Sequence, residues 1–156
     1  MILYSQRDPS WAELKLGDSP LTMGRYGCTT SCIAMLSTYF QPFIPYTPGS
    51  IINASQPRHL RYTAPGGLIL WPSAKFEHFA FYRRVYERND AEIQRHMKDP
   101  NLAVILEVAN RSHWVVGVSR NPITGSYKIA DPWIGDYATM ARYKNDITGA
   151  AYFGRV

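Results

Sequence analysis

The chain has 156 residues, of which 46% are hydrophobic, so its length fits one domain with a sizeable buried core. Its net charge of +5 is modest and scattered, and no basic run interleaves with aromatic residues as a nucleic-acid groove requires. We therefore expect no nucleic-acid partner. The positive charge serves ordinary solubility, or it favours an anionic partner such as a cell-wall polymer.

The two cysteines, Cys28 and Cys32, are four residues apart, and on one helix such side chains are poorly placed for a disulfide, so we expect free thiols. Residues 1–7 lack the basic and apolar regions of a signal peptide, and the longest apolar run, 102–109, is too short to span a bilayer. We expect a chain that is soluble and cytoplasmic as synthesised. If it acts in a virion or at the cell wall, another component delivers it.

The first predicted element is a helix over residues 27–40. Gly24, Gly27 and the polar pair Thr29-Thr30 mark its start. Apolar side chains then recur at spacings of three and four, which predicts one buried stripe. The members of the stripe are Cys32, Met35, Leu36, Tyr39 and Phe40.

Residues 41–75 hold six of the eleven prolines, so this segment is predicted to be irregular, with at most a short helix near residues 49–55. A second helix is predicted over residues 91–98. Asn89 or Asp90 caps its start, and Pro100 lies just beyond its end.

The rest of the chain is predicted to be β-structure. Runs at 102–108, 113–119 and 126–130 read as strands, and the tail at 150–153 could add another. The turn at 121–125 joins two of them. A helix followed by an antiparallel sheet predicts an α+β fold, with residues 1–156 forming a single domain of two lobes.

The hairpin around this turn has a register that brings a histidine near a carboxylate. With the turn centred on residue 122 or 123, antiparallel partners have numbers that sum to about 244 to 246. His113 then falls opposite Asp131 or its immediate neighbours, close enough for a hydrogen bond. The carboxylate would orient the imidazole and favour its charged form. Pro132 ends the pairing because it has no N–H to donate.

Cys28 falls in the predicted first turn of the first helix, where unpaired N–H groups and the helix macrodipole favour an anion. The thiolate is the reactive form of cysteine, and a neighbouring imidazolium favours it further. A cysteine–histidine pair activated in this way attacks amide carbonyls and forms a thioester. Tyr26-Gly27, directly before the cysteine, leave room for a substrate to approach the backbone.

Four segments resemble, in the same order, those of bacterial and phage papain-like cysteine peptidases, which are related to the peptidases that cleave bacteriocin leaders after a double glycine. The matching residues are Gln6-Arg7-Asp8-Pro9-Ser10-Trp11 with Leu16-Gly17, Tyr26-Gly27-Cys28-Thr29-Thr30, His113-Trp114-Val115-Val116-Gly117, and Ile129-Ala130-Asp131-Pro132-Trp133-Ile134-Gly135. The resemblance implies a papain-like fold, with the cysteine on a helical lobe and the histidine and aspartate on a sheet lobe.

The resemblance also implies a role for each residue. Cys28 is the nucleophile, His113 the general base and then acid, and Asp131 the residue that orients the base. Gln6 supplies a side-chain donor to the oxyanion hole beside the Cys28 N–H, a contribution worth about 3 to 4 kcal/mol. In the strict leader peptidases the helper glutamine is closer to the cysteine, at a position that is Thr22 here. Leader processing is therefore less favoured than other amide cleavage.

Each candidate also has a structural interpretation when taken alone. A helix cysteine is usually buried, a strand-end histidine is usually a satisfied polar residue, and an aspartate before proline is usually a turn former. Cys32 is predicted to be a core residue. The remaining histidines, His59, His78 and His96, are expected at the surface or in structural positions. Trp71, Trp114 and Trp133 are core candidates, and one of the latter two could wall a cleft.

We therefore expect a cysteine peptidase that hydrolyses a peptide or a peptidoglycan cross-bridge through an acyl-thioester, with Cys28, His113, Asp131 and Gln6 as the site residues. No cofactor is implied. A zinc site from Cys28, Cys32 and His113 is disfavoured because no fourth ligand has a usual spacing. An acyl transferase would use the same residues. The alternative from another class is a non-catalytic papain-like module that binds a peptide in a virion or secretion assembly.

Overall fold

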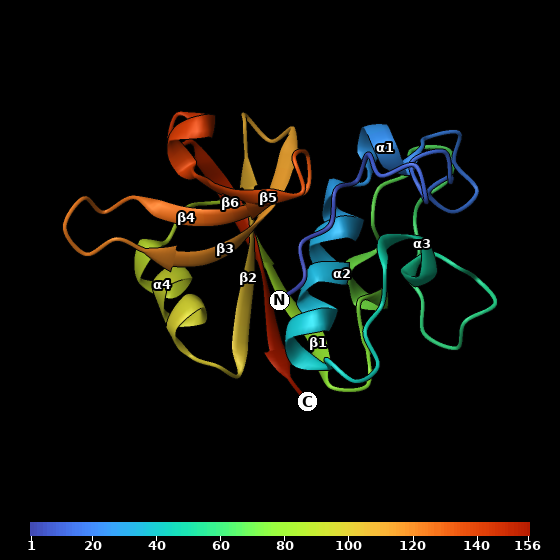
Figure 1. Cartoon of the computed structure of the whole chain (residues 1–156), viewed down its shortest axis with the longest axis horizontal. Helices are drawn as coiled ribbons and strands as arrows, with labels where there is room; N and C mark the ends of the chain where they lie inside the picture. The colour runs from blue at the N-terminus through green and yellow to red at the C-terminus, as the bar shows by residue number, and fades with distance from the viewer.

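The computed structural model describes all 156 residues as a mixed α+β structure with one six-stranded antiparallel sheet, in the strand order β1-β6-β2-β3-β4-β5 (Figure 1). The strands are β1 (Phe79–Val85), β2 (Leu102–Val108), β3 (His113–Arg120), β4 (Tyr127–Asp131), β5 (Asp136–Thr139) and β6 (Ile147–Arg155). The helices are α1 (Met23–Tyr26), α2 (Cys28–Phe40), α3 (Pro48–Ile51) and α4 (Asp90–Lys98), with single 3₁₀ turns η1 (Trp71–Ser73) and η2 (Met140–Tyr143). None of the helices is long and apolar enough to cross a membrane.

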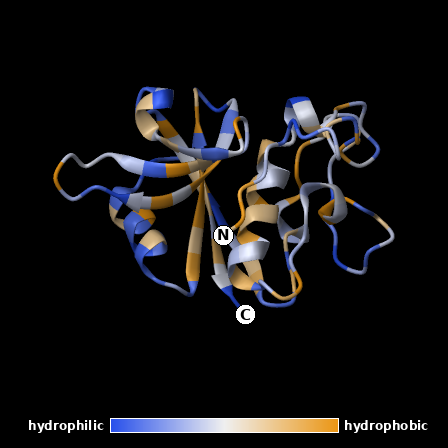
Figure 2. Cartoon of the chain, in the orientation of Figure 1, coloured by the Kyte–Doolittle hydropathy of each residue, from blue (hydrophilic) through white to orange (hydrophobic).

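The central strands β2 and β6 are covered on both faces, with α2 on one side of the sheet and α4 on the other (Figure 1). Successive strand residues point to opposite faces. In β2, Ala103 and Ile105 join the core on the α2 side, whereas Val104 and Leu106 join the core on the α4 side. Because both faces of β2 are buried, its sequence is an almost continuous run of apolar residues. Figure 2 shows this strand as hydrophobic along its length.

Helix α2 is enclosed nearly all round, by the sheet on one side and by the 41–75 region on the other. Its apolar residues share one core with Ile51, Leu60 and Phe76 of the loop region and with sheet residues. Two of its buried hydroxyl groups are satisfied within the helix, because Ser37 and Thr38 each donate to the carbonyl three residues earlier, at 2.7 Å. The helix therefore lies inside the molecule and holds its first residue in a defined place.

The predicted helices are confirmed, with one correction. The helix predicted over residues 27–40 begins at Cys28, and the second helix begins at Asp90 with Asn89 as its cap, whose side chain accepts from the Glu92 N–H at 3.1 Å. The 41–75 region contains only a four-residue helix and a 3₁₀ turn, as expected. The predicted buried stripe of α2 is wrong at Tyr39, which is 40% exposed and donates to the Pro100 carbonyl at the surface.

The predicted strands are all present, but both edge strands of the sheet were missed. In β1, two adjacent arginines and a bulge between Phe81 and Arg83 break the alternation that identifies a strand. In β5, only four residues pair with β4, and most of them are exposed. Edge strands are covered on fewer sides, so their sequences carry a weaker hydrophobic pattern.

Candidate active site

Cys28 is the first residue of α2 and is 9% exposed. Gly27 separates it from α1, and a Cβ at Gly27 would lie 2.5 Å from the Met23 carbonyl oxygen, so only glycine fits this tight junction. The N–H of Cys28 has no partner within its own helix, because the first N–H groups of an α-helix lack an acceptor one turn earlier. The side chain is thus placed where free N–H groups and the positive end of the macrodipole favour an anion.

His113 begins β3 and Asp131 ends β4, and the imidazole Nε2 lies 2.8 Å from Oδ1 of the carboxylate. The register pairs Val116 with Ala130. This register has a sum of 246, at the upper end of the predicted range. One step further along, Asp131 is opposite Val115, so His113 is a diagonal neighbour of Asp131, two residues from the position directly opposite. Diagonal neighbours remain within reach of long side chains, and the hydrogen bond forms across the diagonal.

The Asp131 carboxylate is completely buried and has four polar contacts. Besides His113, it accepts hydrogen bonds from the Tyr143 hydroxyl and from the Trp133 N–H at 2.9 Å, and Arg142 Nε lies 3.2 Å from Oδ2. Burial alone would raise the pKa of this carboxyl group, but the hydrogen bonds from His113, Tyr143 and Trp133 outweigh burial and hold that pKa below its ordinary value. The group is therefore an anion at neutral pH.

The His113 side chain is 12% exposed. Its burial would lower the pKa of the imidazole, but the hydrogen bond with Asp131 and the neighbouring Cys28 side chain raise that pKa to about 9. The imidazole is consequently protonated at neutral pH. Because Nε2 is engaged by Asp131, Nδ1 is the nitrogen that remains free for another partner.

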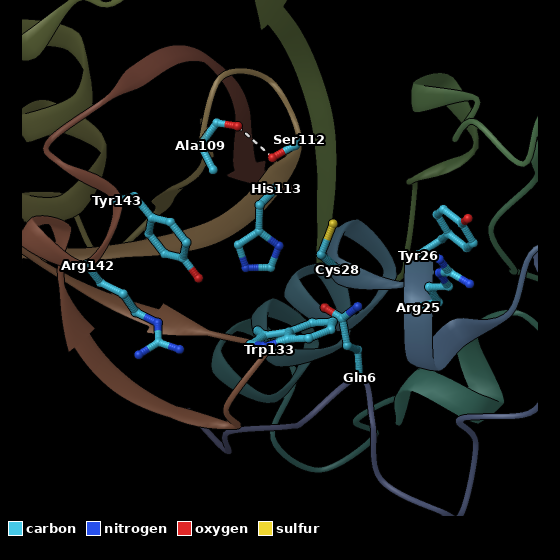
Figure 3. A pocket seen from close by; sticks show the side chains of 10 residues that line it. All are labelled: Gln6, Arg25, Tyr26, Cys28, Ala109, Ser112, His113, Trp133, Arg142 and Tyr143. Atoms are coloured by element: carbon cyan, nitrogen blue, oxygen red, sulfur yellow. Dashed lines mark hydrogen bonds between the residues drawn. The ribbon is translucent and has the colours of Figure 1, made fainter.

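Cys28 and His113 line one cavity of about 570 Å³, here called the His113 cavity. Figure 3 shows the two side chains facing each other from opposite sides, the cysteine from α2 and the histidine from β3. The other lining residues are Gln6, Arg25, Tyr26, Ala109, Ser112, Trp133, Arg142 and Tyr143. The cavity can thus admit a substrate to the sulfur and the imidazole together.

Gln6 lies in the N-terminal segment and is buried, at 2% exposure. Its Nε2 donates to the Gly24 carbonyl at 3.2 Å, which uses one of its two N–H bonds, and its Oε1 has no partner. Figure 3 shows the amide group directed toward Cys28. Its backbone N–H donates to the Pro132 carbonyl at 2.8 Å, which ties the segment to the sheet. Gln6 and Cys28 therefore line the same cavity, and one N–H of Nε2 is not used by the Gly24 carbonyl.

Cys28 also borders a second cavity of about 520 Å³, here called the Trp114 cavity. Its walls are mainly apolar and include Trp71, Trp114 and Leu68. Arg84 and Glu107 also line it, and they form an ion pair with an N···O distance of 2.6 Å. Cys28 therefore lies between the two cavities, and His113 lines only the first of them.

Sequence reasoning missed Arg142 and Tyr143, both of which contact Asp131. No sequence motif identifies them, because η2 approaches the Asp131 carboxylate only in the folded chain. The number of residues between η2 and Asp131 gives no sign of this contact. The sequence Tyr-Lys-Asn-Asp, which follows a short polar strand, predicts only a turn. Of the two tryptophans that flank the candidate pair, Trp133 walls the His113 cavity, and Trp114 walls the other.

The remaining candidates lie outside the site. Cys32 is completely buried in the core, as predicted, and burial raises the pKa of its thiol well above the ordinary value. Both cysteines are free. His96 is buried and His78 is exposed. The chain brings no three histidine, cysteine, aspartate or glutamate side chains together in a way that could hold a metal ion.

A scan of protein-family models finds no match to this chain, and no curated protein sequence matches it.

Proposed function

We propose that this protein is a papain-like cysteine peptidase that hydrolyses a peptide or peptidoglycan amide bond through an acyl-thioester. The observation that carries the proposal is the shared cavity: Cys28, at the N-terminus of a buried helix, and His113, held by the buried Asp131, open on the same space. A helix that carries the cysteine and packs against an antiparallel sheet that carries the other two residues also supports a papain-like fold.

In the first step, the Cys28 thiolate attacks the carbonyl carbon of the scissile amide. His113 faces the thiolate as an imidazolium ion, because its pKa of about 9 keeps the ring protonated at neutral pH. The developing oxyanion is stabilised by the Cys28 N–H and by the free N–H of Gln6 Nε2. Donors placed at the developing charge contribute about 3 to 4 kcal/mol each.

In the second step, His113 Nδ1 gives its proton to the leaving amine, the carbon–nitrogen bond breaks, and the thioester remains. A water molecule then attacks the thioester carbon while the neutral imidazole accepts a proton from it, and the acid product and the thiolate are released. Asp131 stays ionised throughout, and its hydrogen bond keeps Nδ1 directed at the reacting atoms.

The substrate lies across the sulfur, with one part in each cavity. Two hollows that meet at Cys28 support an extended chain cleaved in its interior. A peptide or a peptidoglycan cross-bridge has this shape. A cell-wall substrate would be reached by way of a virion or an export system.

The test compares the reactivity of the two thiols. With limiting iodoacetamide near neutral pH, Cys28 should be alkylated about 100-fold faster than Cys32, because Cys32 is completely buried and its thiol has a raised pKa. His113→Ala should slow alkylation of Cys28, and the exposed His78→Ala should not. Peptide mass spectrometry measures both rates. Equal, slow labelling of the two cysteines would instead favour a module that only binds a peptide.

A second measurement identifies the reaction. Purified cell walls and a peptide library are incubated with the wild-type protein and with Cys28→Ala, and new amino groups are counted. The wild-type protein should release amino groups from at least one of these substrates, and Cys28→Ala should release none. Release by both proteins at the same rate would exclude Cys28 as the nucleophile.

A further inference from the structure

The His113 cavity carries an unbalanced positive charge. Two of its ten lining residues are arginines, Arg25 and Arg142, and none has a carboxylate. The nearest carboxylate, that of Asp131, is completely buried and already has four polar contacts, so it does not face the cavity as a free anion. Asp131 offsets part of the charge of Arg142 from behind the cavity wall, but no acidic side chain pairs with Arg25, so a ligand in this space meets a positive field.

Arg25 is exposed and has no ion pair and no side-chain hydrogen bond, and its guanidinium group lies 5.8 Å from the ring centre of its neighbour Tyr26. It comes from α1, on the helical side of the cavity. Arg142 comes from η2, on the sheet side. Arg142 contacts Asp131 through Nε, but its side chain is 42% exposed, so part of the guanidinium group is accessible from the cavity. Figure 3 shows the two arginines on opposite sides of the cavity.

The mechanism determines which part of the substrate occupies this cavity. His113 protonates the leaving amine, and His113 lines the His113 cavity but not the Trp114 cavity. The residues that follow the scissile bond consequently lie between Arg25 and Arg142, and the acyl part lies in the Trp114 cavity. This step rests on the proposed function.

We propose that the His113 cavity selects substrates whose leaving amine carries a carboxylate, bound by Arg25, while Arg142 on the opposite side of the cavity adds to the positive field. A guanidinium group matches a carboxylate in charge and in geometry, because two parallel N–H donors meet two oxygens. The carboxylate is either the chain terminus of a short leaving peptide or an acidic side chain beside the cleaved bond. Both place the same anion in the same space.

The test uses acyl transfer, which isolates the leaving side of the cleft. The 4-nitrophenyl ester of acetylglycylglycine acylates Cys28 with release of nitrophenolate, and added amines compete with water for the thioester. The amine nitrogen bonds to the acyl carbon, the carbon–sulfur bond breaks, and His113 accepts the proton of the amine, which regenerates the imidazolium and the Cys28 thiolate. By microscopic reversibility, the amine occupies the place of the leaving group.

Four amines distinguish the two sources of the carboxylate. Alanyl-alanine is compared with alanyl-alaninamide for a terminal carboxylate, and aspartyl-alaninamide with asparaginyl-alaninamide for an acidic side chain. In at least one pair, the wild-type protein should transfer the acyl group to the carboxylate-bearing amine about 5-fold more efficiently than to the neutral one. Higher ionic strength should reduce this preference, because salt screens exposed charges.

Arg25→Gln is the decisive variant, since Arg25 does not contact Asp131. It should bring the preference close to one. Arg61→Gln removes the same charge from an exposed arginine that lines neither cavity, and it should keep the preference. Arg142→Gln should lower both the preference and the rate, because Arg142 also contacts Asp131.

Two failures are distinguishable. If the wild-type protein releases nitrophenolate no faster than Cys28→Ala, no acyl-enzyme forms. The proposed function is then wrong, and the carboxylate site has no basis. If the acyl-enzyme forms but both pairs of amines react equally, or if Arg25→Gln keeps the preference, the carboxylate site is wrong while the peptidase remains.

Discussion

The Asp131→Asn variant separates the electrostatic role of this residue from its role in packing. Asparagine has nearly the same shape and can still accept the hydrogen bond from the Trp133 N–H, which lies 2.9 Å from Oδ1. It removes the negative charge that faces His113 and Arg142. Because burial favours the neutral imidazole, the pKa of His113 should fall once the carboxylate is gone.

The size of the effect follows from the pKa of His113, which the fold raises from 6.5 to about 9. At about 1.36 kcal/mol for each pKa unit, this rise corresponds to at most about 3 kcal/mol of folding free energy. The folded state binds the proton more tightly than the unfolded state, so this contribution is fully present below pH 6.5 and is lost as the pH rises through about 9. In Asp131→Asn, only the Cys28 side chain still opposes burial, and most of the contribution should vanish.

Two measurements check this prediction without a substrate. In NMR of the protein with ¹³C-labelled imidazole rings, the His113 resonance should titrate near pH 9 in the wild type and at least one pKa unit lower in Asp131→Asn. In urea unfolding, the wild type should lose stability between pH 6.5 and 9, and the variant should lose less.

The control is Asp136→Asn, which removes an exposed carboxylate from β5 and should leave the titration of His113 unchanged. A His113 midpoint that is the same in Asp131→Asn as in the wild type would refute the reasoning. It would mean that the carboxylate at 2.8 Å does not set the protonation of the imidazole, and the proposed role of Asp131 would have no basis.

Two further substitutions test other parts of the structure. Gln6→Ala should lower kcat for amide cleavage about 100-fold, because an oxyanion donor acts in the transition state, and it should leave the alkylation rate of Cys28 unchanged. Equal losses in both assays would instead show that Gln6 only positions the cysteine. Gly149→Ala should cost about 2 kcal/mol in urea unfolding, because its Cβ would lie 2.6 Å from the Val85 carbonyl oxygen. Gly154→Ala on the same strand has no contact under 3.5 Å and should cost less than about 1 kcal/mol, and equal costs would contradict the crowding argument.

The elements that the sequence predicted well are those whose residues are buried on a regular pattern. The continuous apolar run of β2 and the glycines before α2 are local signals, and they place these elements within a residue of their observed bounds. The edge strand β1 contains Arg83 and Arg84. These two charged residues interrupt the alternation of apolar and polar residues, so the hydropathy pattern does not predict that β1 pairs with β6. Tyr39 fits the helical period but lies on the side of α2 that the rest of the molecule leaves open.

The candidate site was predictable in part, for a related reason. Turn arithmetic brings His113 near Asp131 because a hairpin constrains its two strands locally, although the observed contact is diagonal. The approach of α2 to this hairpin depends on packing across the whole core, so spacing alone carries no information about it. The contacts of Arg142 and Tyr143 with the carboxylate have the same origin.

The distance of Gln6 from Cys28 along the chain becomes understandable in the same terms. The N-terminal segment crosses to the sheet, where the Gln6 N–H donates to the Pro132 carbonyl at 2.8 Å and Arg7 Nε donates to the Trp133 carbonyl at 2.9 Å. Gly135, with a φ of +66°, leaves room for this crossing, because a Cβ there would lie 2.9 Å from the segment. The position of Gln6 is therefore set by its attachment to the residue after Asp131. A glutamine attached in this way need not be close to the cysteine in sequence, so its 22-residue separation from Cys28 does not weigh against an oxyanion role.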